Sequence, residues 1–170
     1  MIDKGTGKDD YKNMTQQNVL SVLVVNSIGV LGRVAGLFSR RGYNIKSLNV
    51  AETENPEISR MTIVAEGDEA AVEQVVKQLL KLYDVSEVKI LRDAVCREHI
   101  IVQAGNSSAS RQPIIEIANL FRAKVVNVGE SSLMLELTGE PEKINSFIGL
   151  LRPYQIKKLV RTGISALERD

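Results

Sequence analysis

The residues best placed to bind a small molecule form one short turn, Asn26-Ser27-Ile28-Gly29-Val30-Leu31, directly after an apolar run. A glycine just before a helix lets the chain turn sharply and keeps the backbone approachable. The first N–H groups of that helix, expected at Gly29, Val30 and Leu31, have no partner inside it and lie at the positive end of its dipole. Such a turn can hold a carboxylate without a cationic side chain, and the Asn26 amide adds donors and an acceptor. The same residue types also occur in purely structural turns, so spacing alone leaves both interpretations open.

Asn44 is a second residue of this kind, because it follows Gly42-Tyr43 where a helix gives way to a strand. An asparagine at such a junction binds a ligand in some proteins and only stabilises the turn in others. Arg33, Arg40 and Arg41 are expected on a solvated helix face.

Residues suited to catalysis are few. His99 is the single histidine, so no pair of histidines is present to hold a metal. Cys96 lies three positions earlier, but closeness in sequence does not by itself make a nucleophile and its base. The chain has no P-loop and no GxSxG, and no GxGxxG run follows a predicted strand. We therefore expect no catalytic residue and no metal site.

Composition excludes several other classes. The 170 residues contain 22 Lys and Arg against 21 Asp and Glu, whereas nucleic-acid binders usually carry a basic excess. Aromatic residues make up only 4%, which leaves few platforms for stacking bases. A single cysteine allows no intramolecular disulfide and fits a reducing compartment. No apolar run approaches the roughly 20 residues of a membrane span. We expect a soluble protein with no nucleic-acid or membrane partner, in the cytoplasm or, in a photosynthetic source, the plastid.

Hydrophobic periodicity predicts the elements of the first half. The apolar run 19–25 is a strand, and apolar residues at helical spacing from Leu31 to Phe38 indicate a helix that stops near Gly42. Strands are expected at 44–51, 61–65 and 85–91, with a loop at 52–58 and a second helix after an Asp68 N-cap. The first strand is apolar at nearly every position, which indicates burial on both faces or a sheet continued by a partner chain.

The second half follows the same order. Strands are expected at 100–103, 124–128, 133–137 and 156–160. One helix is expected to begin at Pro113, and another to follow Gly139 and Pro141. The predicted fold is α+β, with two ferredoxin-like βαββαβ domains in tandem. The predicted limits are a flexible segment at 1–17, a first domain at 18–92 and a C-terminal domain at 93–170, joined near 92–96.

Several segments of this sequence resemble a known family. Residues 20–82 are similar to the N-terminal ACT domain of acetolactate (acetohydroxyacid) synthase small subunits. The most specific motifs are RVAGLFSRRGYNI at 33–45 and SRMTI at 59–63. The link VCRE at 95–98, FRAKVV at 121–126 and VRTG at 160–163 extend the resemblance over residues 18–168.

The resemblance implies a non-catalytic regulatory subunit in branched-chain amino-acid biosynthesis. Members of the family form homodimers in which two ACT domains join side by side into one sheet with the helices on one side. A branched-chain amino acid, usually valine, binds between the two domains and causes feedback inhibition. The effector site matches Asn26, Gly29, Val30 and Leu31 together with Asn44 and Ile45, with amides for the carboxylate and asparagines for the amino group.

The resemblance also implies a partner, the large catalytic subunit, which the small subunit activates. Thiamine diphosphate, FAD and magnesium are expected on that partner and no cofactor on this chain. The sequence departs from the family at Ile28, where proline or serine is usual, and at Val25, where an acidic residue is common. The C-terminal half has Gly105-Asn106-Ser107-Ser108 in place of the effector turn, so we expect no effector there and a contact with the catalytic subunit instead.

Three alternatives share parts of this pattern. One is a stand-alone ACT-type amino-acid sensor that regulates another protein. A second is an RNA-binding ferredoxin-like domain, which needs aromatic residues on its middle strands, and 59–65 has none. An acylphosphatase-like enzyme would need an arginine in the first loop, and 26–31 has none.

Overall fold

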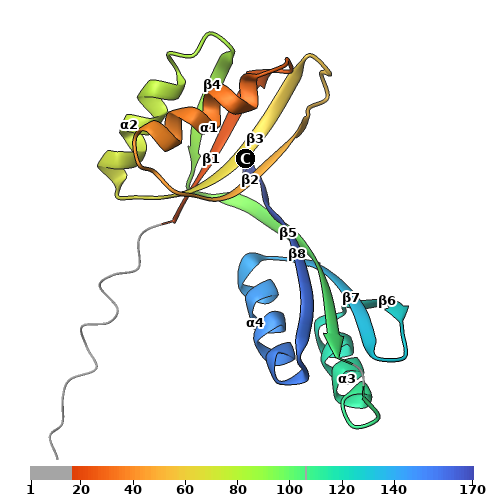
Figure 1. Ribbon diagram of the computed structural model, residues 1–170. Coiled ribbons are helices and arrows are strands. Elements are labelled where there is room, and N and C mark those ends of the chain that lie inside the picture. The colour runs from red at the N-terminus through yellow and green to blue at the C-terminus, as the bar shows by residue number, and fades with distance from the viewer. Residues whose placement is uncertain (1–16, 106) are drawn as a thin grey trace, which may run out of the picture.

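The computed structural model describes residues 17–105 and 107–170, which form two αβ units one after the other (Figure 1). The expected flexible segment, residues 1–17, lies outside the described residues except for Gln17, with which the first strand begins. The N-terminal domain consists of β1 (Gln17–Val25), α1 (Val30–Arg40), β2 (Ile45–Glu52), β3 (Ile58–Glu66), α2 (Glu69–Leu79) and β4 (Val85–Leu91). The C-terminal domain consists of β5 (Ala94–Gly105), α3 (Arg111–Phe121), β6 (Lys124–Val128), β7 (Ser132–Gly139), α4 (Pro141–Leu151), the 3₁₀ turn η1 (Arg152–Tyr154) and β8 (Ile156–Glu168).

The N-terminal sheet has the strand order β2-β3-β1-β4, and every neighbouring pair is antiparallel. One face carries both helices, since alternate residues of the strands share a core with the apolar faces of α1 and α2. Leu20 and Phe38 are fully buried at its centre. Asp68 caps α2 by accepting a hydrogen bond from the Ala71 N–H, as predicted.

The C-terminal sheet repeats this topology with the order β6-β7-β5-β8. Its core packs α3 and α4 against one face, with the rings of Phe121 and Phe147 5.3 Å apart. Pro141 stands at the start of α4, as expected, whereas α3 begins two residues before Pro113. The predicted α+β fold with two ferredoxin-like domains in tandem is confirmed.

Two strands are much longer than their apolar runs predicted. β5 and β8 extend past the C-terminal core, and Ala94–Glu98 pairs with Ile164–Glu168 in a two-stranded interdomain ribbon. The predicted linker at 92–96 is therefore largely strand. The ribbon was missed because polar residues such as Arg97, Glu98 and Ser165 interrupt it, so no apolar run marks it. The predicted limits at 92 and 93 stay a prediction.

The interdomain ribbon packs on the face of the N-terminal sheet that has no helices. The Asn49 side chain of β2 donates to Ser165, and Lys89 of β4 pairs with Glu168 at 3.3 Å. Ser21 of β1 is only 2% exposed on that face. The predicted burial of the first strand on both faces is thus found at Ser21, beside the chain's own C-terminal strand, whereas Val19 and Leu23 on the same face are half-buried. Extension of the sheet by a partner stays a prediction.

Candidate effector site

The turn between β1 and α1 exposes a row of free backbone donors. Gly29 is the N-cap of α1 and has φ 87°, a conformation that residues with a Cβ rarely adopt. The N–H groups of Gly29, Leu31 and Gly32 donate no hydrogen bond to any residue that the structure describes, while that of Val30 reaches the Ser27 carbonyl at 3.4 Å. These donors lie at the positive end of the helix dipole, so the turn is suited to a carboxylate.

Some side chains around the turn are buried in the core, and others are exposed at the surface. Val30 is 2% exposed and belongs to the core, so only its backbone is available to a ligand. Leu31 is 46% exposed and Ile28 is fully exposed. The larger residue that this chain carries at position 28 therefore points to solvent rather than into the turn.

Arg33, expected on a solvated helix face, is a further candidate for binding the carboxylate. A Cβ built on Gly29 would lie 3.1 Å from Arg33 Nη1, so the guanidinium lies beside the turn. Its Nε donates to Asp84 Oδ2 at 2.8 Å, which anchors it there. The sequence could have indicated this position, because Gly29 and Arg33 are four residues apart and residues at that spacing lie on the same face of a helix.

Asn26 and Asn44 are each bonded to a glutamate. The Asn26 Nδ2 donates to Glu52 Oε1 at 3.1 Å and to the Pro56 carbonyl at 2.9 Å. The Asn44 Nδ2 donates to Glu66 Oε2 at 3.1 Å. Neither Oδ1 accepts a hydrogen bond from the part of the chain that the structure describes.

The six predicted site residues fall into two groups. Asn26, Gly29, Val30 and Leu31 are together, whereas Asn44 and Ile45 lie at the other end of the sheet. β1 and β2 are both antiparallel to β3 and thus parallel to each other. Asn26 bonds to Glu52, which pairs with Ser59, and Asn44 bonds to Glu66. Ser59 and Glu66 are seven residues apart on β3, about 23 Å in an extended strand. Within one chain the six predicted residues therefore do not form a single site.

Comparison with known proteins decides the family. Residues 20–87 match the model of the AHAS small subunit-like ACT domain, and residues 97–170 match the model described as small subunit of acetolactate synthase. This chain belongs to the acetolactate synthase small-subunit family. The resemblance noted in the sequence is confirmed, and the first ferredoxin-like domain of this small subunit is an ACT domain.

Relatives cover nearly the whole small subunit. A probable acetolactate synthase small subunit of Archaeoglobus fulgidus is 47% identical over 90% of this chain and 97% of its own length. The acetolactate synthase small subunit of Mycolicibacterium smegmatis is 44% identical over 92% of this chain and 94% of its own. The crystal structure of the Thermotoga maritima acetolactate synthase small subunit matches with a TM-score of 0.84 at 36% identity, covering 91% of this chain and 98% of that one.

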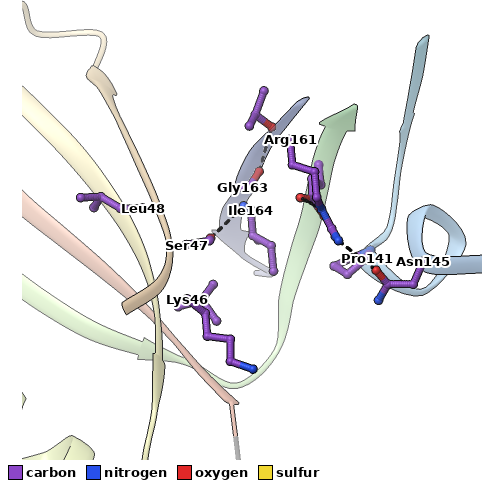
Figure 2. Close-up of a pocket in the computed structure, with 11 residues that line it drawn as sticks. Lys46, Ser47, Leu48, Pro141, Asn145, Arg161, Gly163 and Ile164 are labelled. Atoms are coloured by element: carbon purple, nitrogen blue, oxygen red, sulfur yellow. Dashed lines mark hydrogen bonds and ion pairs between the residues drawn. The ribbon is translucent and has the colours of Figure 1, made fainter. Parts of the chain in front are cut away.

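A cavity of about 480 Å³ lies between the two domains of this small subunit (Figure 2). Lys46, Ser47 and Leu48 of β2 form one wall, and residues of β8 and α4 form the other. Lys46 is the extra residue of a β-bulge and pairs with Glu66 at 2.7 Å, so Asn44, which bonds to Glu66, adjoins this cavity.

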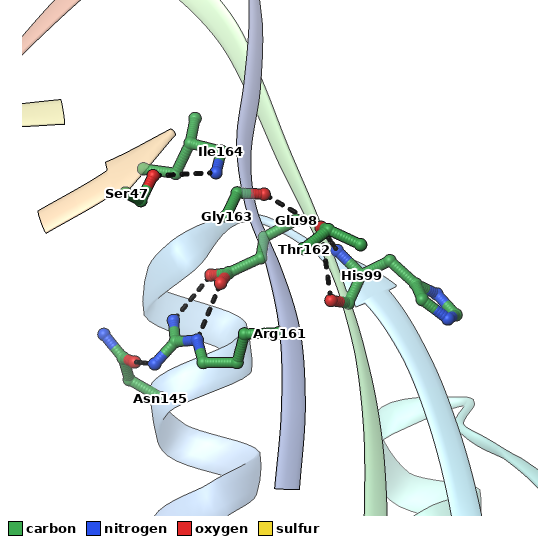
Figure 3. A network of polar contacts seen from close by, with 8 residues as sticks. All are labelled: Ser47, Glu98, His99, Asn145, Arg161, Thr162, Gly163 and Ile164. Carbon is green, nitrogen blue, oxygen red and sulfur yellow. Dashed lines mark hydrogen bonds and ion pairs between the residues drawn. The ribbon is translucent and has the colours of Figure 1, made fainter. Parts of the chain in front are cut away.

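The register shift between β5 and β8, next to the interdomain ribbon, lies at this cavity, and a network of polar contacts surrounds it (Figure 3). Arg161 donates through Nε and Nη2 to both oxygens of Glu98, at 2.6 and 2.5 Å. Gly163 has φ 80°, and a Cβ there would lie 2.9 Å from Ser47 Oγ, which accepts a hydrogen bond from the Ile164 N–H. Only a glycine fits where β8 crosses β2.

The residues considered for catalysis are not assembled into a site. His99 Nδ1 lies 3.1 Å from Thr138 Oγ1, and no hydrogen bond joins it to Cys96 among the described residues. Burial raises the pKa of the Cys96 thiol, which makes it a poorer nucleophile. In residues 17–105 and 107–170, no three His, Cys, Asp or Glu side chains group as a metal site. No helix in these ranges is long and apolar enough to cross a membrane.

Proposed function

We propose that this chain is the regulatory subunit of an acetolactate synthase. It binds valine or a related branched-chain amino acid between the ACT domains of two copies, activates a large catalytic subunit and confers feedback inhibition on it. Thiamine diphosphate, FAD and magnesium belong to that partner. Membership of the small-subunit family supports the partnership.

The observation that carries the effector site is the separation of its two half-sites, the Asn26 turn and Asn44 with Ile45. β2 lies at the edge of the sheet, with Asn44 just before its first residue and Glu52 as its last. If the β2 strands of two copies pair antiparallel about a two-fold axis, Asn44 of one copy comes beside the Asn26 turn of the other. The dimer then has two identical composite sites, whereas a single chain has none.

The chemistry of each composite site suits a small amino acid. The free N–H groups after Gly29 and the Arg33 guanidinium face a carboxylate. The Oδ1 atoms of Asn26 and Asn44 accept from an ammonium group. Leu31, 46% exposed, offers apolar surface beside them for a branched side chain.

Acetolactate formation by the matched large subunit, with and without this chain and across a valine titration, tests the proposal. Activation followed by inhibition is the expected result. Gly29→Asp should abolish the valine response and keep activation, because its carboxylate competes with that of the effector. Gly29→Ala is the control, since it imposes the same backbone strain without the charge and should retain part of the response.

Two results contradict the proposal. A normal valine response in Gly29→Asp would place the effector elsewhere. No activation of a matched catalytic subunit would favour the stand-alone sensor.

A further inference from the structure

Both asparagines of the candidate site have a fixed amide orientation. Asn26 uses both N–H bonds of its amide, one toward Glu52 and one toward the Pro56 carbonyl. What it can still offer a ligand is its Oδ1, an acceptor. Asn44 is turned in the same sense by Glu66. Glu52 and the Pro56 carbonyl therefore present Asn26 to the ligand as an acceptor only, whereas Glu66 occupies one N–H of Asn44 and leaves its Oδ1 open.

Charge around the Asn26 turn is divided in the same way. On one side is Glu52 at the end of β2, which forms no ion pair with a described residue. On the other side are the free N–H groups and the Arg33 guanidinium. A ligand lying across the turn thus has negative charge and acceptors at one end, and at the other end N–H donors, including those of Arg33, whose charge Asp84 partly compensates.

We propose that Glu52, and Glu66 in the other half-site, are positioning residues that restrict the effector to a zwitterion. By orienting Asn26 and Asn44, these two glutamates make the site accept α-amino acids and reject the 2-oxo acids that have the same side chain. This inference rests on the proposed function, because it concerns the same site. A 2-oxo acid has the carboxylate and the branched chain but no ammonium group. Its carbonyl oxygen would face the Oδ1 acceptors and leave them without a donor, which disfavours binding.

Glu66 has the environment that this role requires. Hydrogen bonds from Lys46 and from Asn44 lower its pKa, so it is ionised at neutral pH. Lys46 compensates part of its charge at 2.7 Å. Glu52 has no such cation among the described residues, so substitutions at Glu52 should affect discrimination more strongly.

Isothermal titration of the whole chain with valine and, separately, with 3-methyl-2-oxobutanoate tests the inference. The wild-type chain should bind valine and bind the 2-oxo acid far more weakly. Glu52→Gln removes the charge and keeps an acceptor for Asn26, and should weaken valine binding about three- to tenfold. Binding of the 2-oxo acid should stay equal or improve, so the gap between the two ligands narrows.

Glu54→Gln is the matched control. It removes the same charge two residues away, but Glu54 makes no hydrogen bond to Asn26. Its ratio of valine to 2-oxo acid affinity should stay near the wild-type ratio. Glu52→Asp keeps the charge and should restore part of the discrimination.

The outcomes separate this inference from the proposed function. If the wild-type chain binds valine and Glu52→Gln discriminates as well as Glu54→Gln does, Glu52 has no positioning role and the inference is wrong. Equal weakening of both ligands would show a merely structural role and would also overturn it. If the wild-type chain binds no branched-chain amino acid at all, the proposed function fails and the inference with it.

Discussion

Glu98 is almost wholly buried, whereas Arg161, its ion-pair partner, keeps 37% of its side chain exposed. The pair joins β5 to β8 at their register shift beside the interdomain ribbon, and Arg161 also donates to Asn145 of α4 at 3.2 Å. Hydrogen bonding to Glu98 raises the pKa of Arg161, so the guanidinium stays charged. The two residues therefore differ in what each leaves behind when the other is removed.

Arg161→Met should destabilise the chain more than Glu98→Gln. The first change leaves a buried carboxylate without a cation, at a cost of about 3 kcal/mol. The second leaves a partly exposed guanidinium that water can solvate, at a cost of about 1 kcal/mol. Chemical denaturation of both variants measures the difference in free energy of unfolding. Arg97→Met, which removes an exposed pair with Glu140, is the control and should change little. Equal costs for the two Glu98–Arg161 variants would contradict this account.

Gly163→Ala should be costly, because the added methyl would meet Ser47 Oγ at 2.9 Å in a backbone conformation that already disfavours a side chain. We expect a loss of about 2 kcal/mol in the free energy of unfolding. Gly42→Ala is the matched control, since Gly42 has φ 72° with open space around it. The excess loss at Gly163 measures the contact between β8 and β2. An equal loss at both positions would mean that backbone strain alone sets the cost.

Acid should remove the contribution of Glu66 to stability. Hydrogen bonds from Lys46 and Asn44 hold its pKa below the ordinary value, so the folded state favours the ionised form. The resulting stabilisation is fully present above about 4.5, the ordinary pKa, and is lost as the pH falls through the lower pKa of the folded state. Thermal melting of the wild-type chain and Glu66→Gln between pH 7 and pH 3 should show curves that converge on acidification. Parallel curves would refute the assignment.

If the proposed half-sites meet only between two copies, the two asparagine variants should complement each other. Asn26→Ala and Asn44→Ala homodimers should each lose valine binding, because each lacks one residue in both composite sites. Mixed dimers have one intact site and one doubly altered site. An equimolar mixture after subunit exchange should therefore regain about a quarter of the wild-type number of valine sites, since about half of random dimers are mixed. Titration calorimetry counts these sites, and no recovery in a mixture shown to contain mixed dimers would mean that both asparagines act in one chain.

Most elements could be predicted because the N-terminal domain follows local rules. The stripe from Leu31 to Phe38, the Asp68 cap and the valine-rich first strand each determine their own element. The interdomain ribbon follows none of these rules. Polar residues interrupt it, and Ser165 and Glu168 bond to the N-terminal sheet, so its strand character depends on a surface far away in sequence.

The candidate site was predictable in its parts but not in its arrangement. Unpartnered N–H groups after Gly29 follow from the residue types in the turn. That Asn26 and Asn44 lie at opposite ends of the sheet depends on strand order, which only the tertiary structure provides. The fixed amide of Asn26 likewise depends on Glu52, which the hairpin brings back beside it.

If the effector binds between two copies, as proposed, the parallel course of β1 and β2 also ties effector affinity to protein concentration. Because one chain cannot supply both halves of a site, an effector that binds between copies must also strengthen their association, by the same factor in both directions. Dilution below the dimer dissociation constant would then weaken the apparent affinity for valine, and saturating valine would hold dimers together at concentrations where the free subunit separates. Sensitivity to the amino acid would thus rise with the cellular amount of this chain.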